Sequence, residues 1–311
     1  MESKKTILAT TSSFAKEFPE VLELIENNGL NIVLNPLART LSEEELNRLL
    51  EEHKPVGLLA GTEPITRSAL ARAEDYLRVI SRVGVGWENV DRDFAEQLGV
   101  LVYRTQGVLN QAVAELTIGL ILSALRYISS NDRLVRQGKW HKTLGGLLCE
   151  KIVGIIGFGH IGQRVGELVT AFGAKVIYND LQPIKVSWAQ AVSLSELLTQ
   201  AEIITIHASG KEKIIGLEEF GNICKRGVIL VNTARGDLID EKALQDCLQE
   251  GRVGFACLDV FENEPYCGPL CSFDNVILTP HIGSYAKEAR VLMERTAVEN
   301  LLRGLREVEV L

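Results

Sequence analysis

The feature that most constrains the fold is a regular alternation between short apolar runs and stretches with helical periodicity. Many of the runs are rich in Val, Ile and Leu on both faces, which is typical of strands buried in a parallel sheet. The alternation therefore predicts an α/β protein built on parallel sheets. The predicted strands are Thr6–Ala9, Asn31–Leu34, Val56–Leu59, Leu77–Ser81, Ile152–Ile156, Lys175–Tyr178, Ile203–His207, Val228–Asn232, Phe255–Asp259 and Val276–Leu278.

Two domains are expected, because a chain of 311 residues exceeds the usual size of a single domain. The first four predicted strands form one small α/β domain, and the series that begins at Ile152 forms the second. Val108–Ile128 is the longest predicted helix and is apolar on nearly all sides. Such a helix is usually buried between domains or at an oligomer interface. A final helix is predicted over Ala286–Leu305.

A phosphate-binding motif opens the second series of strands. The apolar run that ends at Ile156 leads directly into Gly157-x-Gly159-x-x-Gly162, and a helical pattern follows. These glycines allow a tight turn, close approach to a pyrophosphate and close helix–strand packing. Asp180 ends the next strand, where a carboxylate can accept both ribose hydroxyls of NAD and would repel the 2′-phosphate of NADP. The spacing therefore predicts a Rossmann domain that binds NAD.

Three polar residues follow strands of the second series: Arg235, Glu264 and His281. Ligand sites of α/β proteins collect at this edge of the sheet. The arginine can bind a substrate carboxylate with a bidentate fork and polarise the neighbouring carbonyl. The histidine can exchange the proton of a hydroxyl, and a carboxylate beside it raises its pKa. This set is typical of hydride-transfer chemistry on a 2-hydroxy acid.

Composition excludes several other classes of partner. The net charge of −8 argues against nucleic acid or an anionic membrane as a partner. Cys267 and Cys271 have no second cysteine pair nearby, so no metal site is predicted. The sequence shows neither a signal peptide nor a run long enough to span a membrane. A cytoplasmic protein is expected.

The motifs together resemble the D-isomer-specific 2-hydroxyacid dehydrogenase family. The resemblance extends from about Val56 to Asn300. It implies two Rossmann-like, doubly wound parallel-sheet domains with a cleft between them. Residues 1–101 and 284–311 would form the substrate domain, and residues 102–283 the NAD-binding domain. The segments that carry the resemblance are GTEPIT (61–66), RVGVGWENVD (82–91), NQAVAELTIGLILSALR (110–126), GFGHIG (157–162), VNTARGDLID (231–240), CLDVFENEP (257–265) and PHIGS (280–284).

The same resemblance assigns roles to individual residues. Arg235, Glu264 and His281 would be the catalytic residues. Substrate-binding residues would be Gly61, Arg82, Val85, Gly86 and Arg235. Residues that contact the cofactor would be Val85, Gly157, Gly159, His160, Ile161, Gly162, Asp180, Ala208, Thr233, Ala234, Arg235, Asp259, His281, Gly283 and Ser284. Asp259 would lie near the carboxamide of the nicotinamide.

The sequence departs from the family pattern in three places. The usual H-x-P-L after the strand at 203–207 is His207-Ala-Ser-Gly here, on the adenosine side. Leu147-Leu-Cys-Glu-Lys replaces the usual segment before the glycine motif. Trp87 occupies a position near the substrate that often holds a smaller residue. None of these changes removes a predicted catalytic group.

Several substrates are compatible with the family. Residues 61–66 and 81–91 look most similar to phosphoglycerate dehydrogenases, in a short form without regulatory domains. This likeness implies oxidation of 3-phosphoglycerate to 3-phosphohydroxypyruvate in serine biosynthesis, with Arg82 contacting the phosphate. Ala60 stands where some of those enzymes have another arginine. Alternative activities are glyoxylate or hydroxypyruvate reduction and a D-lactate-type reaction. An NAD(H)-sensing corepressor is the alternative of another class. The resemblance also implies a homodimer, built largely on the NAD-binding domains.

Overall fold

The computed structural model describes residues 4–210, 212–223 and 227–311 and divides the chain into two compact units. One unit contains Met1–Leu109 together with Ala286–Leu311, and the other is the continuous segment Asn110–Tyr285. The first unit is therefore assembled from both ends of the chain. The sequence analysis placed the domain boundaries at 101/102 and 283/284, whereas the units change at 109/110 and 285/286.

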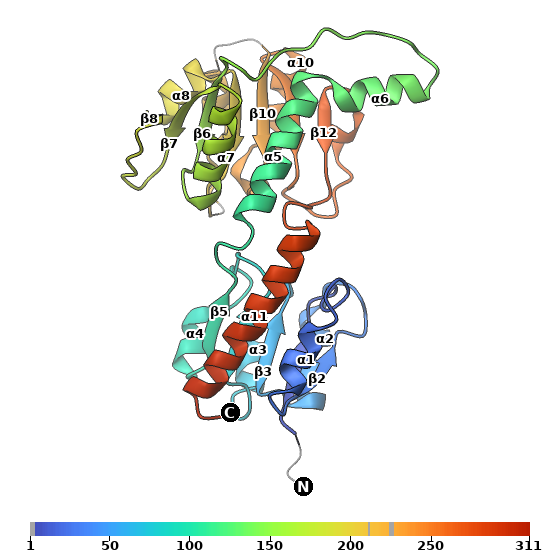
Figure 1. The fold of residues 1–311 in the computed structure, drawn as a ribbon, viewed down its shortest axis with the longest axis vertical. Helices are drawn as coiled ribbons and strands as arrows, with labels where there is room; N and C mark the ends of the chain where they lie inside the picture. Colours follow the sequence, from blue (N-terminus) through green and yellow to red (C-terminus); the bar gives the residue numbers. More distant parts are fainter. Residues whose placement is uncertain (1–3, 211, 224–226) are drawn as a thin grey trace. The chain divides into compact units, whose positions relative to one another are not determined.

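The first unit is a five-stranded parallel sheet in the order β2-β1-β3-β4-β5. Leu58, Ile80 and Leu46 belong to the hydrophobic core on one face of this sheet. The last helix packs against the sheet and lies beside it in Figure 1. The elements are β1 (Thr6–Ala9), α1 (Val21–Glu26), β2 (Asn31–Leu34), α2 (Glu43–His53), β3 (Gly57–Ala60), α3 (Arg67–Arg72), β4 (Val79–Arg82), α4 (Arg92–Gln97), β5 (Leu101–Arg104) and α11 (Lys287–Glu307).

The second unit is a seven-stranded parallel sheet in the order β12-β11-β10-β9-β6-β7-β8. Alternate residues along its strands enter separate cores on the two faces, as the pleat of a strand requires. On β6, Ile155 contributes to one core and Ile156 to the other. The strands are β6 (Ile152–Ile156), β7 (Lys175–Asn179), β8 (Ala189–Ala191), β9 (Ile203–Ile206), β10 (Val228–Asn232), β11 (Val253–Leu258) and β12 (Val276–Leu278).

Helices cover both faces of this seven-stranded sheet. Residues of α5 and α7 contribute to one core, and residues of α8, α9 and α10 contribute to the other. The helical elements are α5 (Asn110–Leu125), α6 (Ile128–Arg136), α7 (His160–Ala171), α8 (Leu194–Gln200), α9 (Leu217–Gly221), α10 (Glu241–Gln249) and two short 3-10 turns, η1 (Gly236–Leu238) and η2 (Pro269–Ser272).

Two strands and one helix break were not predicted from the sequence. β8 has three residues and is mostly exposed, so it produces no apolar run. The residues of β5 are apolar up to Tyr103 but only partly buried, and this run was not assigned to a strand. The helix predicted over Val108–Ile128 ends at Leu125, because Tyr127 adopts a left-handed conformation with φ of 51° before α6 begins. The longest helix is consequently α11, with 21 residues, and not α5, with 16.

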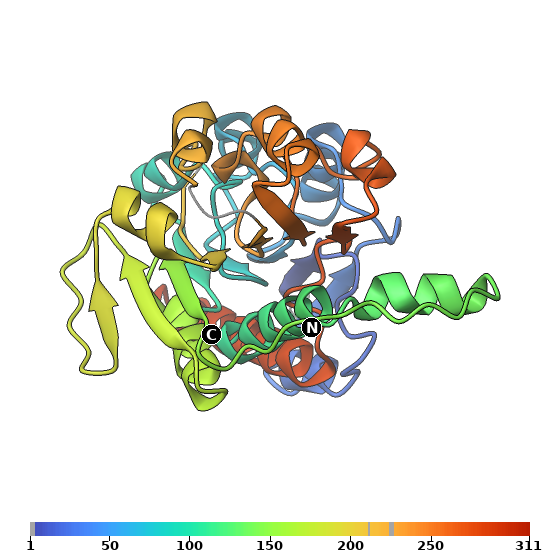
Figure 2. The same cartoon turned by 90° about the horizontal axis from the view of Figure 1, so that it is seen from above.

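The projecting part of the 110–285 unit is α6 and the segment after it, which extend away from the sheet in both ribbon views (Figures 1 and 2). No residue of α6 is buried within the chain. Among the described residues, no single helix has both the length and the hydropathy to cross a membrane. Helices α5 and α6 meet those criteria only when taken together, across a bend of 62°.

Candidate active site

The glycine motif forms a narrow turn between β6 and α7. Gly157 has φ of 86°, and a Cβ there would lie 2.4 Å from the backbone nitrogen of Ala208. At Gly162 a Cβ would lie 2.1 Å from the Gly157 carbonyl oxygen. Gly159, at the start of α7, faces open space, where a side chain would fill the approach to the helix N-terminus. The turn thus leaves room for an anion at amide groups that carry the positive end of the helix dipole.

Asp180 lies directly after β7, at the same edge of the sheet. Its Oδ2 accepts a hydrogen bond of 2.6 Å from the Phe158 amide inside the glycine turn. Its Oδ1 accepts one of 2.7 Å from the Gln182 amide. Each carboxylate oxygen keeps a further lone pair for a ribose hydroxyl. A hollow of about 310 Å³ is lined by Asp180 together with Tyr178, Pro183 and Ile184, among others. The carboxylate is therefore held at the position expected for a dinucleotide site.

Glu264 and His281 form a hydrogen-bonded pair. His281 Nδ1 lies 2.8 Å from Glu264 Oε2, and Glu264 Oε1 accepts a 3.1 Å bond from the Phe261 amide. The hydrogen bond to Glu264 raises the pKa of His281 and outweighs the opposing effect of burial. Burial favours the neutral form of Glu264, but His281, the Phe261 amide and the charge of Arg235 together lower its pKa. The arrangement stabilises an imidazolium–carboxylate pair and leaves Nε2 for another partner.

Arg235 lies after β10, close to this pair. Its Nη1 donates a 2.7 Å bond to the Ala234 carbonyl, and its own carbonyl accepts one of 2.8 Å from Asn232 Nδ2. A Cβ on Gly236 would overlap the backbone of Phe261, at 1.9 Å, so the loops after β10 and β11 touch. The positive charge of Arg235 lowers the pKa of both Glu264 and His281. The structure therefore brings the three predicted catalytic residues together.

Asp259 anchors the segment that carries His281. It is 1% exposed, and Oδ1 accepts bonds from the Ile282 amide at 2.8 Å and from the Thr279 hydroxyl at 2.6 Å. Oδ2 accepts one of 2.8 Å from the Gly283 amide. His281 has an uncommon φ of 54°, which these contacts on both sides hold in place. Both carboxylate oxygens of Asp259, a predicted cofactor residue, are thus used to position the segment that carries His281.

Two residues that were not predicted from the sequence, Asn232 and Thr117, support the site. Asn232 is buried at the end of β10, and its side chain accepts a 3.0 Å bond from the Ala234 amide. Thr233, a predicted cofactor residue, bonds Thr117 on α5 at 3.0 Å. In the sequence, the signal for Asn232 and Thr233 is a pair of polar residues directly after an apolar run. His207 is partly buried, with Nε2 2.9 Å from the Thr205 hydroxyl, and desolvation of its ring lowers its pKa to about 3, so it stays neutral.

The remaining predicted cofactor residues, apart from Val85 in the other unit, lie on the same edge of the 110–285 sheet. His160 and Ile161 begin α7, and Ala208 follows β9. Ser284 follows Gly283 after β12. These positions follow the carboxyl ends of β6, β9 and β12, where a dinucleotide binds in open α/β sheets.

The predicted substrate residues outside Arg235 lie in the five-stranded unit. Gly61 follows β3, and Arg82 ends β4, with Val85 and Gly86 in the next loop. Arg82 is only 9% exposed; its guanidinium donates to the Val83 carbonyl and lies against Gly84. Trp87 lies between two guanidinium groups, 4.2 Å from Arg92 and 4.1 Å from Arg104.

The family model described as "D-isomer specific 2-hydroxyacid dehydrogenase, NAD binding domain" matches residues 118–283, more than half of the chain. This chain belongs to the D-isomer-specific 2-hydroxyacid dehydrogenase family. It is therefore an NAD-dependent dehydrogenase of this family, and the 110–285 unit carries the NAD-binding domain. The glycine turn, the open N-terminus of α7 and Asp180 fit that cofactor.

Relatives of this dehydrogenase carry more than one name. D-3-phosphoglycerate dehydrogenase of Methanocaldococcus jannaschii is 38% identical over 87% of the chain, which spans 53% of that protein. Glyoxylate reductase of Aeropyrum pernix is 37% identical, with 92% of this chain and 89% of the relative covered. Hydroxypyruvate reductase of Thermotoga maritima is 36% identical, with coverages of 85% and 89%. Glyoxylate reductases are the more frequent among these similar proteins.

Solved structures agree with this assignment of the dehydrogenase. The TT0316 protein of Thermus thermophilus has a TM-score of 0.90 at 34% identity, with 97% of each chain covered. The two predicted parallel-sheet domains are thus confirmed by the fold of known proteins.

Proposed function

We propose that this dehydrogenase reduces a small, unphosphorylated 2-oxo acid to the 2-hydroxy acid, either glyoxylate to glycolate or hydroxypyruvate to D-glycerate. The proposed reduction is supported by one observation, the hydrogen-bonded pair of His281 and Glu264 beside Arg235. The choice of substrate rests on the relatives, among which glyoxylate and hydroxypyruvate reductases outnumber phosphoglycerate dehydrogenases. This choice replaces 3-phosphoglycerate, which the sequence analysis favoured.

Each residue of the trio has a distinct task in the reduction. Arg235 binds the carboxylate of the acid and polarises its carbonyl. His281, held protonated by Glu264, donates a proton from Nε2 to the carbonyl oxygen as negative charge develops there. The hydride for the new C–H bond at C2 would come from NADH, which the glycine turn and Asp180 would hold. Glu264 stabilises the imidazolium before transfer and orients the ring afterwards. Proton and hydride together convert the 2-oxo acid into the 2-hydroxy acid.

Cofactor contacts are proposed for residues that the structure places around the glycine turn and strand ends. Gly157, Gly159, Gly162, His160 and Ile161 would hold the pyrophosphate through backbone amides. Asp180 would bind the adenosine ribose and disfavour NADP. The remaining members of the proposed set are Val85, Ala208, Thr233, Ala234, Arg235, Asp259, His281, Gly283 and Ser284.

The second candidate is oxidation of 3-phosphoglycerate. It is supported by the 38% identity to the Methanocaldococcus jannaschii protein of that name. Here Arg82 would bind the phosphate, together with Gly61, Val85 and Gly86. The buried position of Arg82 against Gly84 gives this candidate less support than the reductase.

The test is a comparison of reduction rates for four acids, each with NADH and with NADPH. The acids are glyoxylate, hydroxypyruvate, 3-phosphohydroxypyruvate and pyruvate. The proposal predicts the highest kcat/KM for glyoxylate or hydroxypyruvate with NADH. A higher kcat/KM for the phosphorylated acid would favour the second candidate, and a preference for NADPH would contradict the role of Asp180.

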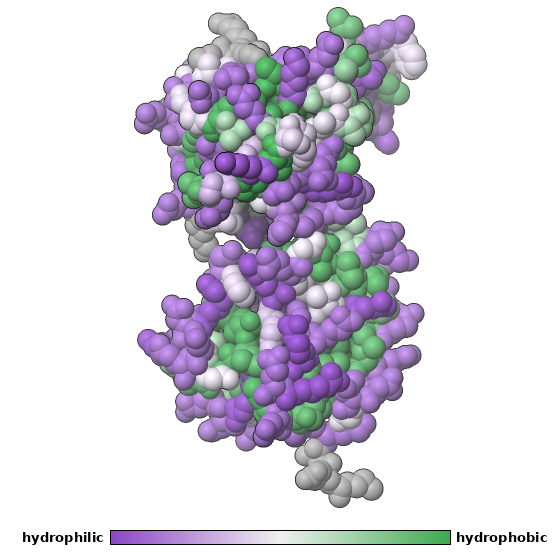
Figure 3. Space-filling model, turned by 60° about the vertical axis from the view of Figure 1, so that its left-hand side comes forward, coloured by the Kyte–Doolittle hydropathy of each residue, from purple (hydrophilic) through white to green (hydrophobic). Residues whose placement is uncertain are grey.

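A homodimer is proposed as the working assembly. Apolar side chains are exposed on α6 and the segment after it, where Trp140 is 84%, Leu144 94% and Leu147 69% exposed. In Figure 3, hydrophobic residues reach the surface of the same unit among hydrophilic ones. Arg126 and Leu147 line a hollow of about 470 Å³ beside this segment. Exposed apolar residues on a projecting segment are typical of a surface covered by a second copy of the chain.

A further inference from the structure

Phe158, inside the glycine turn of the 110–285 unit, has its amide and its carbonyl both bonded by side chains. The amide donates to Asp180 Oδ2 at 2.6 Å, and the carbonyl accepts a hydrogen bond of 2.9 Å from Gln163 Nε2 on α7. The Phe158 ring is fully buried and stacks on Tyr178, with the ring centroids 3.9 Å apart. Phe158 is therefore held by three contacts, one of which comes from α7.

The bond from Gln163 also sets the direction of the next amide. A trans peptide group is planar, so its carbonyl and its N–H point in opposite directions. The Phe158 carbonyl and the Gly159 N–H belong to one such trans group. Because Gln163 holds the carbonyl, the Gly159 N–H is directed away from the Gln163 side chain.

The Gly159 amide is available to a ligand. It donates no hydrogen bond to any residue that the structure describes. Gly159 is the N-cap of α7, and a Cβ there would meet no described atom within 4 Å. The amide is thus open at the positive end of the helix dipole, where the pyrophosphate of a dinucleotide is expected.

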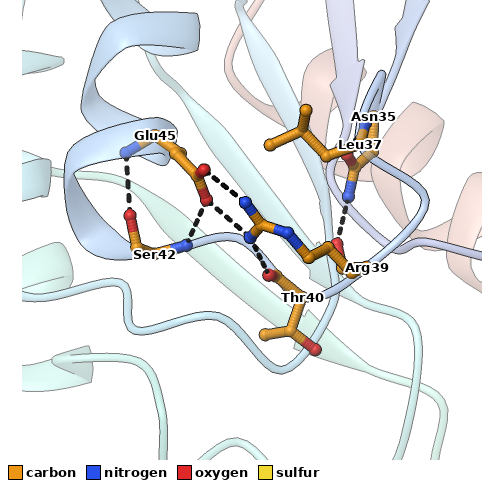
Figure 4. Close-up of polar contacts among 6 residues, drawn as sticks. All are labelled: Asn35, Leu37, Arg39, Thr40, Ser42 and Glu45. Carbon is orange, nitrogen blue, oxygen red and sulfur yellow. Dashed lines mark hydrogen bonds and ion pairs between the residues drawn. The ribbon is translucent and has the colours of Figure 1, made fainter.

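The N-terminus of α2, in the other unit, shows the usual way in which side chains close a helix (Figure 4). The Ser42 hydroxyl accepts a 3.2 Å bond from the Glu45 amide, and the Glu45 carboxylate accepts one of 2.9 Å from the Ser42 amide. Arg39 adds two bonds to the same carboxylate, at 2.9 and 2.6 Å. The N-cap of α7 has no such side-chain bond, and Gln163 bonds a carbonyl instead, which leaves the first amides to a ligand.

We propose that Gln163 is a positioning residue for NAD, which aims the Gly159 amide at the pyrophosphate by holding the Phe158 carbonyl. Without this donor, the peptide group between residues 158 and 159 can rotate, since glycine has no side chain to restrict it. The amide then faces the pyrophosphate in only part of the molecules, and binding of any ligand that carries this group weakens. The inference rests on the proposed contact of Gly159 with NAD and not on the choice of 2-oxo acid.

The test compares wild type, Gln163→Met and a control, Gln249→Met, by calorimetry with ADP-ribose and with adenosine. Methionine keeps the length of glutamine and removes its donor, and Gln249 is exposed at the end of α10 in the same unit. ADP-ribose contains the pyrophosphate, whereas adenosine contains only the part expected at Asp180. In Gln163→Met we expect the Kd of ADP-ribose to rise about tenfold, while the Kd of adenosine keeps its wild-type value. Gln249→Met should change neither.

An unchanged Kd of ADP-ribose in a folded Gln163→Met protein would overturn the inference. An equal rise for both ligands would overturn it too, because a general disturbance of the site would then explain the weaker binding. Circular dichroism reports whether the variant is folded, and Gln163→Leu, which also lacks the donor, is a second variant with the same expected result. The preference among 2-oxo acids is measured separately, so a different substrate would remove the proposed function and leave this inference standing.

Discussion

At the scale of residues, the proposed catalytic site joins side chains that follow three different strands. Glu264 follows β11, Arg235 follows β10, and His281 itself follows β12. Glu264 stabilises the protonated imidazole, whereas Arg235 opposes it, and the net result is a raised pKa for His281. Because reduction requires the acid form of the imidazole, the raised pKa keeps the enzyme active to higher pH.

Replacing Glu264 by Gln should shift the pH profile of the reductive reaction. Without the carboxylate, the pKa of His281 falls, so the imidazole loses its proton at lower pH. The alkaline limb of the kcat profile should therefore move to lower pH, as measured with glyoxylate and saturating NADH. Glu262→Gln, an exposed change in the same loop, is the matched control. Identical alkaline limbs in both variants would remove Glu264 from this role.

At the scale of elements, the strands were largely predictable and the loop contacts were not. Strands such as Ile152–Ile156 and Val228–Asn232 are buried on both faces, and continuous apolar runs mark them in the sequence. The exposed strand β8 lacks such a run. The break at Tyr127 depends on one left-handed residue, which no local pattern marks.

In the candidate site, too, individual residues could be predicted from the sequence, but the contacts between loops could not. Arg235, Glu264 and His281 could be predicted because each follows a predicted strand within a family-like motif. The anchoring of Thr279, Ile282 and Gly283 by Asp259 joins loops about 20 residues apart and becomes visible only in three dimensions.

The anchoring role of Asp259 can be tested with Asp259→Asn. An amide nitrogen would then face one of the donors from Ile282, Gly283 or Thr279, and a buried hydrogen bond would be lost. We expect the free energy of unfolding to fall by about 1–3 kcal/mol and kcat to fall by roughly a hundredfold through displacement of His281. Chemical denaturation and steady-state kinetics measure both quantities.

Asp274→Asn is the control for this change, since Asp274 is exposed just before β12. A variant at Asp259 that keeps wild-type stability and kcat would show that the anchoring contacts have no role in holding the catalytic loop.

At the scale of the whole molecule, the chain forms one unit from both of its ends and the NAD-binding unit from its middle. The NAD-binding unit carries all three proposed catalytic residues, and the other unit carries Gly61, Arg82, Val85 and Gly86, the other predicted substrate residues. The projecting α6 and the apolar segment after it belong to the NAD-binding unit, where we place the dimer contact.

Replacing Trp140 by Glu should disrupt that dimer. A charge at an 84% exposed position costs little within one chain, but burying it against a second copy is unfavourable. Light scattering at micromolar concentration should give the mass of two chains for wild type and of one chain for the variant. Lys139→Glu, a change of charge at the preceding exposed residue, is the control. A monomeric wild type would contradict the proposal.

The central claim, that His281 is the proton donor in NADH-dependent reduction of a small 2-oxo acid, is tested most directly by His281→Ala. The measurement is kcat for glyoxylate reduction, together with the Kd for NADH from fluorescence titration. The account predicts that kcat falls by about 10²–10⁴, while the Kd stays close to the wild-type value, because the glycine turn and Asp180 are untouched. An unchanged kcat would contradict the account.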